Sequence, residues 1–277
     1  MKKLIAAILT LVLALSAVSA LANEKILVGT VTPGPHEVIL EFVREDLAAL
    51  GYDLEIVLMT AYPLPNPATA AGDMDANYFQ HIPYLEAYNN EVPEAEKLIA
   101  AFGVHYEPFG IYAGTKSDLK DVAKGDKIAV TNDPSNEVRG LLLLQDAGLI
   151  KLKEGIGPMS TGTTKEDIAE YLTEIEIVEI DAERITGILP DVAYAVINGN
   201  FAIGAGLSPA RGALLLEPLE GNGQTYVNPI VIRPEDKDAP FVEALRTVLL
   251  TQKVYDFILN EPQFAEGVIP VFEVPAS

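Results

Sequence analysis

The chain reads ILVGTVTPGPHEVILEFVREDLAALGYDLEIVLM over residues 26–59, and this stretch decides the class of fold. The short apolar run at 26–30 predicts a strand that is buried on both faces. Apolar side chains then recur at three- and four-residue spacing over 36–50, which predicts one amphipathic helix with Gly51 as its left-handed C-cap. A second strand follows at 54–59. The stretch therefore predicts a βαβ unit with a right-handed crossover.

The same alternation of strands and helices returns later in the chain. Short apolar runs predict further strands at 127–131, 174–180 and 193–197, with a helix over 134–148. Such alternation is typical of parallel α/β sheets. The last third reads as a strand over 226–233 followed by helices over 240–260.

Proline and glycine gather at 108–114 and at 221–229, and we place two connections between lobes there. We predict one α/β lobe built from both ends of the mature chain, residues 23–110 and 229–277, and a second α/β lobe built from residues 111–228. The alternative is a single doubly wound domain, and composition does not decide between the two.

Acidic residues outnumber basic residues by 40 to 19 in this chain of 277 residues, which gives a formal net charge of −21. Such a surface repels phosphate backbones, so we expect no nucleic-acid partner. The chain contains no cysteine. This excludes disulfides, thiolate nucleophiles, zinc–thiolate sites and iron–sulfur clusters. Apolar residues make up 49% of the chain, enough to bury a substantial core.

The N-terminus has the pattern of a secretory signal peptide over residues 1–22. Two lysines precede an apolar run over 4–15, and a small-x-small pattern typical of a cleavage site ends at Ala22. The alternative is an uncleaved membrane anchor, because the uncharged stretch 4–22 is of the length that spans a bilayer. We favour cleavage, since the strongly apolar part is short, and we expect an exported mature protein.

Histidine is scarce, and His36, His81 and His105 lie far apart in the chain. The sequence has no HExxH motif and no carboxylate pair at helical metal-ligand spacing, so we predict neither a metal site nor a cofactor. It also lacks GxSxG, GxxxxGK[ST] and GxGxxG, the strongest signals of hydrolases, nucleotide-binding and dinucleotide-binding proteins. We therefore predict no catalytic residue.

Aromatic and imidazole side chains gather in NYFQHIPYL at residues 77–85. If this segment follows a strand, Phe79 and His81 lie at the sheet edge where α/β proteins bind ligands. Tyr62, in a proline-rich turn, adds a second ring. The alternative is structural: Phe79 and Tyr84 belong to the core, and His81 caps the helix that follows.

A second group of residues, NDPSNEVR at 132–139, predicts a helix start. Asp133 is a strong N-cap candidate with Pro134 at the first helical position, so the next backbone N–H groups would form an anion site. Arg139 lies less than two turns into this helix, where its guanidinium would hold a carboxylate bidentately. The alternative is an ordinary surface arginine paired with Asp or Glu.

Two asparagines stand next to predicted strands. Asn198 directly follows the strand at 193–197, and Asn228 lies at the second connection between lobes. A buried carboxamide accepts from an ammonium through its oxygen and donates through its nitrogen. The alternative is ordinary turn chemistry. Together, a carboxylate clamp, two carboxamides and an aromatic–imidazole patch suit a small zwitterion with an apolar side chain.

At these residues the sequence resembles the NlpA/MetQ family, the methionine-binding components of ABC importers. The likeness runs through most of the mature chain, from TPGPHEVILEFV at Thr32 through GDMDANYFQHIPYLEAYN, HYEPFGIY and NDPSNEVRGLLLLQDAGLIKLK to VINGNFAIGAGLSP, YVNPIVIR and GVIPVF. These motifs are long and occur in the same order. The resemblance implies a periplasmic-binding-protein-like fold of type II, in which two crossover segments join two α/β lobes around a ligand cleft.

The resemblance also implies a ligand and the residues that bind it. Free L-methionine would lie in the cleft, and the closed form would deliver it to a membrane permease. Arg139 would bind the ligand carboxylate, and Asn198 and Asn228 would bind its ammonium and carboxylate ends. The thioether side chain, whose sulfur suits aromatic edges, would lie among Tyr62, Phe79 and His81.

This chain departs from the resembled family at the end of its signal sequence. Family members are commonly lipoproteins with a cysteine there, whereas Leu15-Ser16-Ala17 is followed by Val18. We therefore predict a soluble exported monomer without a lipid on cysteine. Alternative functions are binding of a methionine-containing dipeptide or another amino acid, an enzyme on the same scaffold, and a sensory subunit that presents its closed form to a receptor.

Overall fold

The computed structural model describes residues 23–220 and 222–274. The first stretch folds into strand β1 (Glu24–Val31), helices α2 (Pro35–Phe42) and α3 (Arg44–Ala49), and strand β2 (Tyr52–Met59). β1 and β2 pair in parallel, so the predicted βαβ unit is confirmed. The prediction of one continuous helix is wrong, because Val43 leaves the helical conformation at φ −98° and ψ 0°. Val43 itself and Leu47 are both fully buried around this break.

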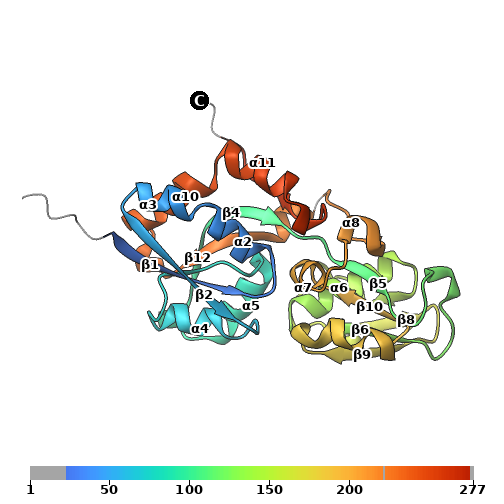
Figure 1. Cartoon of the computed structure of the whole chain (residues 1–277). Coiled ribbons are helices and arrows are strands. Elements are labelled where there is room, and N and C mark those ends of the chain that lie inside the picture. Colours follow the sequence, from blue (N-terminus) through green and yellow to red (C-terminus); the bar gives the residue numbers. More distant parts are fainter. Residues whose placement is uncertain (1–22, 221, 275–277) are drawn as a thin grey trace, which may run out of the picture.

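The first of the two main sheets has the strand order β13-β4-β12-β3-β1-β2. Its other strands are β3 (Ala76–Asn77), β4 (Ile99–Tyr106), β12 (Val227–Ile232) and β13 (Ile269–Pro270). One face packs against α2, α3, α10 (Pro240–Leu249) and α11 (Gln252–Asn260), which share its main core. Helices α4 (Pro65–Ala70) and α5 (Ile82–Glu91) cover the opposite face (Figure 1).

The second main sheet has the order β11-β5-β10-β6-β9. Its strands are β5 (Gly110–Ala113), β6 (Lys127–Thr131), β9 (Glu176–Ile180), β10 (Tyr194–Ile197) and β11 (Ala213–Leu216). Helix α6 (Asn136–Asp146) packs on one face. The 3-10 segment η4 (Ala182–Asp191) and helix α7 (Gly199–Gly204) pack on the other. The strands predicted at 127–131, 174–180 and 193–197 thus all form.

Shorter elements complete the described chain. Strands β7 (Ile150–Leu152) and β8 (Ile168–Tyr171) form a separate two-stranded sheet. Helices α8 (Pro209–Gly212) and α9 (Asn222–Thr225) flank β11. Short 3-10 turns lie at Glu94–Glu96, Leu119–Asp121, Lys165–Asp167, Pro234–Asp236 and Pro262–Phe264.

The chain passes between the two sheets twice, through 107–109 after β4 and through 217–226 before β12. The strand that follows each passage enters its new sheet antiparallel to its neighbours: β5 beside β10 and β11, and β12 beside β3 and β4. Both sheets are therefore mixed: the βαβ strands pair in parallel, as expected, and the strands that follow each passage run antiparallel to them. A strand that arrives from the other lobe runs opposite to the strands that start a βαβ unit.

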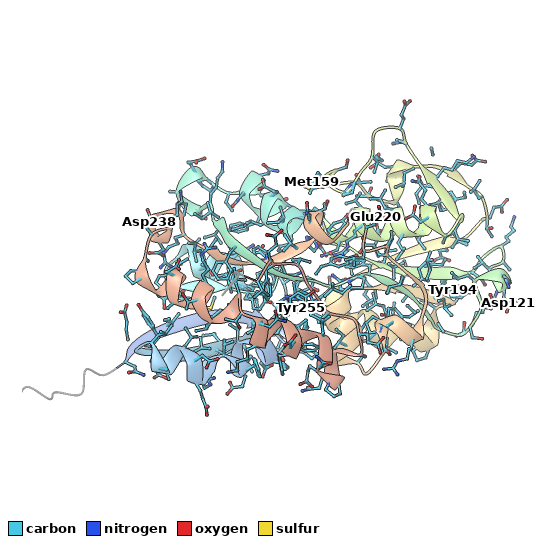
Figure 2. The ribbon with its side chains drawn as sticks, turned by 90° about the horizontal axis from the view of Figure 1, so that it is seen from above. Asp121, Met159, Tyr194, Glu220, Asp238 and Tyr255 are labelled. Atoms are coloured by element: carbon cyan, nitrogen blue, oxygen red, sulfur yellow. The ribbon has the colours of Figure 1, made fainter. Side chains whose placement is uncertain are left out.

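The two sheets with their helices form two lobes that lie side by side (Figure 1). Viewed from above, Asp238 lies at the end of one lobe, and Asp121 and Tyr194 lie at the far end of the other (Figure 2). Among the described residues, no helix has both the length and the apolar composition needed to span a bilayer. The predicted signal peptide, residues 1–22, lies outside the described residues.

Candidate functional site

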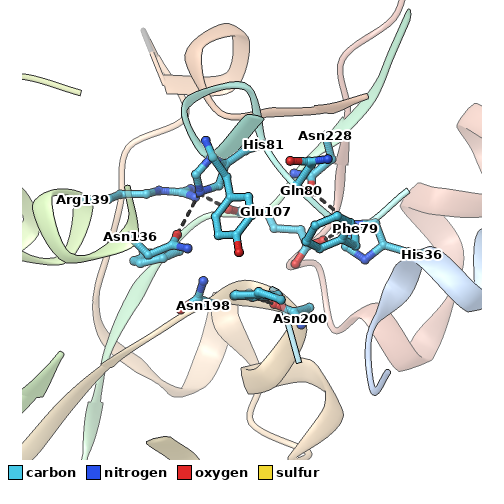
Figure 3. A pocket seen from close by; sticks show the side chains of 14 residues that line it. His36, Phe79, Gln80, His81, Glu107, Asn136, Arg139, Asn198, Asn200 and Asn228 are labelled. Atoms are coloured by element: carbon cyan, nitrogen blue, oxygen red, sulfur yellow. Dashed lines mark hydrogen bonds and ion pairs between the residues drawn. The ribbon is translucent and has the colours of Figure 1, made fainter. Parts of the chain in front are cut away.

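A pocket lies between the lobes, with walls from both (Figure 3). Its lining includes all six side chains that the sequence singled out: Tyr62, Phe79, His81, Arg139, Asn198 and Asn228. They come from segments at both ends and in the middle of the chain, and the fold brings them together. Their role as ligand contacts stays a prediction, but their placement defines the candidate site.

Arg139 extends from α6 to the pocket and is almost completely buried. Its Nε and Nη2 donate to the Glu217 carboxylate, with Nη2 at 2.6 Å from Oε2, and Nη2 also donates to the Glu107 backbone carbonyl at 2.7 Å. The guanidinium carbon lies 4.0 Å from the ring centre of Phe109 and 3.9 Å from that of Tyr226. Two rings and a carboxylate thus hold the guanidinium plane in one orientation.

This arrangement changes the predicted clamp. Arg139 is a buried ion-paired residue, so the alternative of an ordinary surface arginine is wrong. One edge of its guanidinium is already used by Glu217, so a bidentate grip on a ligand through Nε and Nη2 is not available. Of the three guanidinium nitrogens of Arg139, Nε and Nη2 have partners, and Nη1 has no hydrogen-bond partner among the described residues. We expect a ligand anion to meet this remaining edge.

The predicted anion site at the start of α6 is also corrected. The helix begins at Asn136, and the Asp133 carboxylate itself accepts from the Asn136 backbone N–H at 3.0 Å and from its side-chain nitrogen. Burial raises the pKa of Asp133, and these hydrogen bonds oppose that shift. The chain's own carboxylate therefore occupies the position that the sequence assigned to a ligand.

The apolar wall of the pocket is aromatic. The Tyr62 ring centre lies 6.0 Å from that of Phe79, 5.8 Å from that of Tyr84 and 5.2 Å from that of Phe201. Tyr62 and Phe79 belong to the first lobe and Phe201 to the second, and the Tyr62 hydroxyl donates to Asn200 Oδ1 at 2.6 Å across the lobes. The wall therefore forms only where the two lobes meet.

His81 caps helix α5, as the structural alternative predicted, and it also lines the pocket. As the N-cap of α5, its Nδ1 accepts from the Tyr84 backbone N–H at 3.1 Å, so its Nε2 carries the proton. That Nε2 donates to Asn136 Oδ1 at 2.8 Å on the other lobe. Burial, with the nearby Arg139 charge, lowers the pKa of His81 to about 3. It is therefore a neutral, fixed wall of the pocket that also links the lobes.

The two asparagines differ in how they are held. Asn228 accepts from His36 Nε2 at 3.0 Å through Oδ1 and donates to the Tyr226 carbonyl through Nδ2, so both ends of its amide are engaged. Asn198 Oδ1 is buried without a hydrogen-bond partner among the described residues. An unpaired buried acceptor is costly, so Asn198 is the stronger candidate to receive a ligand N–H.

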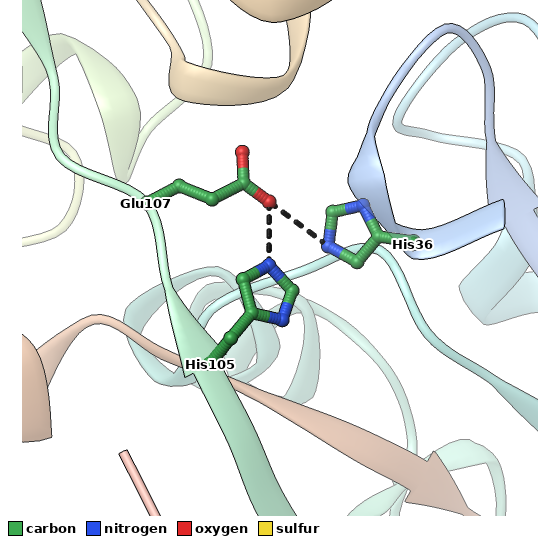
Figure 4. A group of neighbouring side chains, drawn as sticks. All are labelled: His36, His105 and Glu107. Atoms are coloured by element: carbon green, nitrogen blue, oxygen red, sulfur yellow. Dashed lines mark hydrogen bonds and ion pairs between the residues drawn. The ribbon is translucent and has the colours of Figure 1, made fainter. Parts of the chain in front are cut away.

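Glu107 is a buried carboxylate in the pocket wall that the sequence reading did not select. Its Oε1 lies 2.8 Å from His105 Nε2 and 3.3 Å from His36 Nε2 (Figure 4). Burial lowers the pKa of His36 to about 4 and that of His105 to about 3, so both imidazoles are neutral at pH 7. Burial also raises the pKa of Glu107. His36, Arg139 and the Asn200 backbone N–H lower it, but they offset the effect of burial only partly.

His36, His105 and Glu107 are also the described group whose geometry would allow a metal ion to bind. One ligand atom from each lies within 4.8 Å of the others. In this structure the two imidazoles instead contact the same carboxylate oxygen at hydrogen-bond distance. Hydrogen bonds from the two imidazoles to Glu107 therefore hold this cluster together.

Sequence reasoning missed Glu107, Glu217 and the two histidines beside Glu107. The sequence does contain a feature that points to Glu107: it is the one acidic residue in the aromatic stretch HYEPFGIY, where the chain leaves one lobe. No such feature points to Glu217, because it stands in an ordinary acidic segment. The complete pocket has a cationic edge at Arg139, acceptors at Asn198 and Glu107, and aromatic rings between the lobes. Such a set binds a small molecule with a carboxylate, an ammonium and an apolar side chain.

Comparison with known proteins agrees with this geometry. A family model described as NlpA lipoprotein matches residues 26–272. The chain is 35% identical over 256 residues to the methionine-binding lipoprotein MetQ of Bacillus subtilis, covering 91% of this chain and 90% of that protein. It is 38% identical over 208 residues to the D-methionine-binding lipoprotein MetQ of Escherichia coli, covering 74% of each. A solved nutrient binding protein from Burkholderia cenocepacia bound to methionine has a TM-score of 0.82 and 39% identity, covering 89% of this chain and 100% of that one.

Proposed function

Because this chain belongs to the NlpA lipoprotein family, we propose that it is a substrate-binding protein that encloses free L-methionine between its two lobes. The closed form would deliver the amino acid to the membrane permease of an ABC importer. The relatives with methionine in their names support this ligand, as does the methionine-bound neighbour. The observation that carries the proposal is a buried, unpartnered Asn198 Oδ1 in the same enclosed pocket as Arg139.

The free groups of the pocket support one orientation for the proposed ligand. The α-carboxylate meets the Nη1 edge of Arg139, the only edge that Glu217 leaves open. The ammonium donates to Asn198 Oδ1 and to the Glu107 carboxylate, which gives the buried Glu107 a charged partner. Asn228 contributes by holding His36 in the pocket wall.

The thioether would lie among the rings of Tyr62, Phe79 and His81, which all line the pocket. Methionine sulfur packs well against aromatic edges and adapts to irregular apolar space.

We further propose that the protein performs no catalysis. Its chain has no cysteine, and the imidazoles and carboxylate of the pocket are hydrogen-bonded to one another or to asparagines. The two lobes that close on the ligand would be those predicted from the sequence, except that Gly110 in β5 belongs with the second lobe and Val227 and Asn228 in β12 belong with the first. The protein would be an exported monomer without a lipid on cysteine.

Isothermal titration of ligand-stripped protein with L-methionine tests this function. We expect one site per chain and weaker or no binding of alanine and of methionine-containing dipeptides. D-Methionine should be titrated in parallel, because one relative is named for that enantiomer. Absence of heat with either enantiomer, but clear heat with a dipeptide, would refute the proposed ligand. Mass spectrometry after overnight incubation with methionine checks for turnover.

A further inference from the structure

We propose that His105, with Tyr78 behind it, is a positioning residue that orients the Glu107 carboxylate for recognition of the ligand ammonium. This inference rests on the proposed function, because it assigns Glu107 to the ammonium of a bound amino acid. His105 and Tyr78 are both fully buried and lie outside the pocket lining, so neither would touch the ligand.

A chain of hydrogen bonds runs from the core to the pocket through these residues. The Tyr78 hydroxyl lies at hydrogen-bond distance from His105 Nδ1. His105 Nε2 lies 2.8 Å from Glu107 Oε1 on the other side of the ring. The Tyr78 and His105 rings meet edge to face, at 5.4 Å between centres and 89° between planes. The imidazole is thus held at both of its nitrogens.

The donors and acceptors of this chain allow one arrangement for the neutral ring. Burial keeps His105 neutral, so only one of its nitrogens carries a proton. Glu107 accepts when ionised, so Nε2 must donate to it. Nδ1 is then the acceptor and receives the Tyr78 hydroxyl. The Glu107 carboxylate therefore sets the tautomer, and the Tyr78 hydroxyl stabilises it by donating to Nδ1.

His36 holds the same carboxylate oxygen from a second direction. Its Nε2 lies 3.3 Å from Glu107 Oε1 and 3.0 Å from Asn228 Oδ1, two acceptors that share one N–H. With Oε1 occupied by both imidazoles, Oε2 is the oxygen left toward the second lobe (Figure 4). A Cβ on Gly199 would lie 2.9 Å from that Oε2 and 2.6 Å from the Glu107 Cβ. The absence of a side chain at Gly199 lets the second lobe approach the carboxylate.

The consequence is a carboxylate whose direction is fixed before a ligand arrives. Without His105, Glu107 keeps the longer contact to His36 and the hydrogen bond from the Asn200 backbone N–H, so the direction of its carboxylate is less firmly fixed. With one donor fewer on Oε1, the buried carboxylate also takes up a proton more readily, since a hydrogen bond to the ionised form favours that form. Both changes weaken the binding of an ammonium more than that of a neutral hydroxyl at the same position, because a hydrogen bond between charged groups is the stronger one.

Three variants test the proposal. His105→Leu removes the N–H that reaches Glu107, and His105→Gln keeps an amide N–H near the position of Nε2. Tyr78→Phe removes only the hydroxyl that stabilises this tautomer. The ligands are L-methionine and its 2-hydroxy analogue, which has the same carboxylate and thioether but no ammonium. Far-UV circular dichroism and Tm establish that each variant is folded.

We expect His105→Leu to raise the Kd for methionine by about ten- to a hundredfold, the effect of losing a hydrogen bond to a charged group. The Kd for the hydroxy acid should change by less than about threefold. His105→Gln should restore methionine binding to within about threefold of wild type, and Tyr78→Phe should lie in between. Equal loss of affinity for both ligands, or unchanged methionine binding in His105→Leu, would overturn the positioning role.

The pH profile of methionine binding gives an independent reading. The groups that face Glu107 are His36 on α2, His105 on β4, Arg139 on α6 and the Asn200 N–H on α7. Loss of the His105 donor should move the acid limb of the profile to higher pH, because Glu107 then protonates more readily. An acid limb that stays at the wild-type pH in His105→Leu would contradict the proposal.

Two further results separate the competing explanations. Wild-type protein that gives no heat with methionine refutes the proposed function itself, whereas normal wild-type binding with an unaltered His105→Leu refutes only the positioning role. Titration of ligand-free protein with Zn²⁺ alone should show no site that depends on His105. A stoichiometric zinc site lost in His105→Leu would overturn the proposal, because the metal would take the Nε2 atoms that hold Glu107.

Discussion

The ion pair between Arg139 and Glu217 gives the sharpest prediction for stability. Breaking a buried pair by removing one partner costs about 3–5 kcal/mol, because the other charge stays buried. Both side chains are buried, with exposed fractions of 2% and 7%. In Arg139→Met, Glu217 Oε2 keeps the Tyr106 hydroxyl at 2.9 Å and the Phe109 N–H at 3.1 Å. These two donors place the expected cost near the lower limit, about 3 kcal/mol.

The matching double variant separates a stranded charge from lost packing. Glu217→Gln keeps an oxygen for the same two donors, so Arg139→Met combined with Glu217→Gln leaves no buried charge in the cluster. We expect the double variant to recover to within about 1 kcal/mol of wild type. Both variants without Arg139 should lose methionine affinity by about 30-fold or more, since the ligand carboxylate is left unpaired in both.

Differential scanning calorimetry of ligand-free protein measures the effect. A loss of about 3 kcal/mol corresponds to a Tm lower by about 6–12 °C in a protein of this size. Lys25→Ala is the control, because its ion pair with Glu55 is exposed and its removal should leave Tm unchanged. An Arg139→Met variant with wild-type Tm, or a double variant no more stable than the single one, would refute the reasoning.

Three other predictions follow from single groups. Asn198→Ala should weaken methionine binding about tenfold with little change in Tm, because its Oδ1 has no partner among the described residues, whereas Asn228→Ala should lower Tm as well. Burial and the neighbouring Glu179 raise the pKa of Glu137 to about 8, so folding holds its proton and the free energy of unfolding falls as pH rises from 4.5 to about 8. Glu137→Gln should flatten the Tm-against-pH curve over that window, and an unchanged slope would be evidence against the shift. A Cβ on Gly204 would lie 2.3 Å from the Pro33 Cγ of the other lobe, so Gly204→Val should hold the lobes apart, raise the methionine Kd at least tenfold and enlarge the radius of gyration measured by X-ray scattering. Gly157→Ala, where a Cβ meets nothing within 4 Å, is its control.

Local patterns in the sequence predicted much of the fold. A strand, helix and strand over 26–59 follow from apolar spacing, and β1 and β2 pair as expected. His81 caps α5 because a side-chain acceptor stood directly before a helix with proline in its first turn. These features depend on residues within a few positions of one another, so a single sequence carries enough information to predict them.

The six predicted site residues reached one pocket for a similar reason. Four of them follow a strand or precede a helix, Arg139 lies in the first turn of α6, and Asn228 is the second residue of β12. Such positions meet at the edges of α/β sheets. The spacing of these residues did not predict the hydrogen-bond partners of each side chain. Arg139 was expected to offer its full guanidinium, yet one edge is already bound to Glu217, 78 positions further along the chain.

The partners of buried polar groups were decided only by the tertiary structure. Arg139 requires a counter-charge once it is buried, but the chain offers 40 acidic residues, and its sequence does not rank them. His36 and Asn228 are 192 positions apart, and His81 and Asn136 are 55 apart. Helices and strands form from neighbours in the chain, whereas the choice among chemically equivalent partners depends on which of them the packing of two lobes brings within 3 Å.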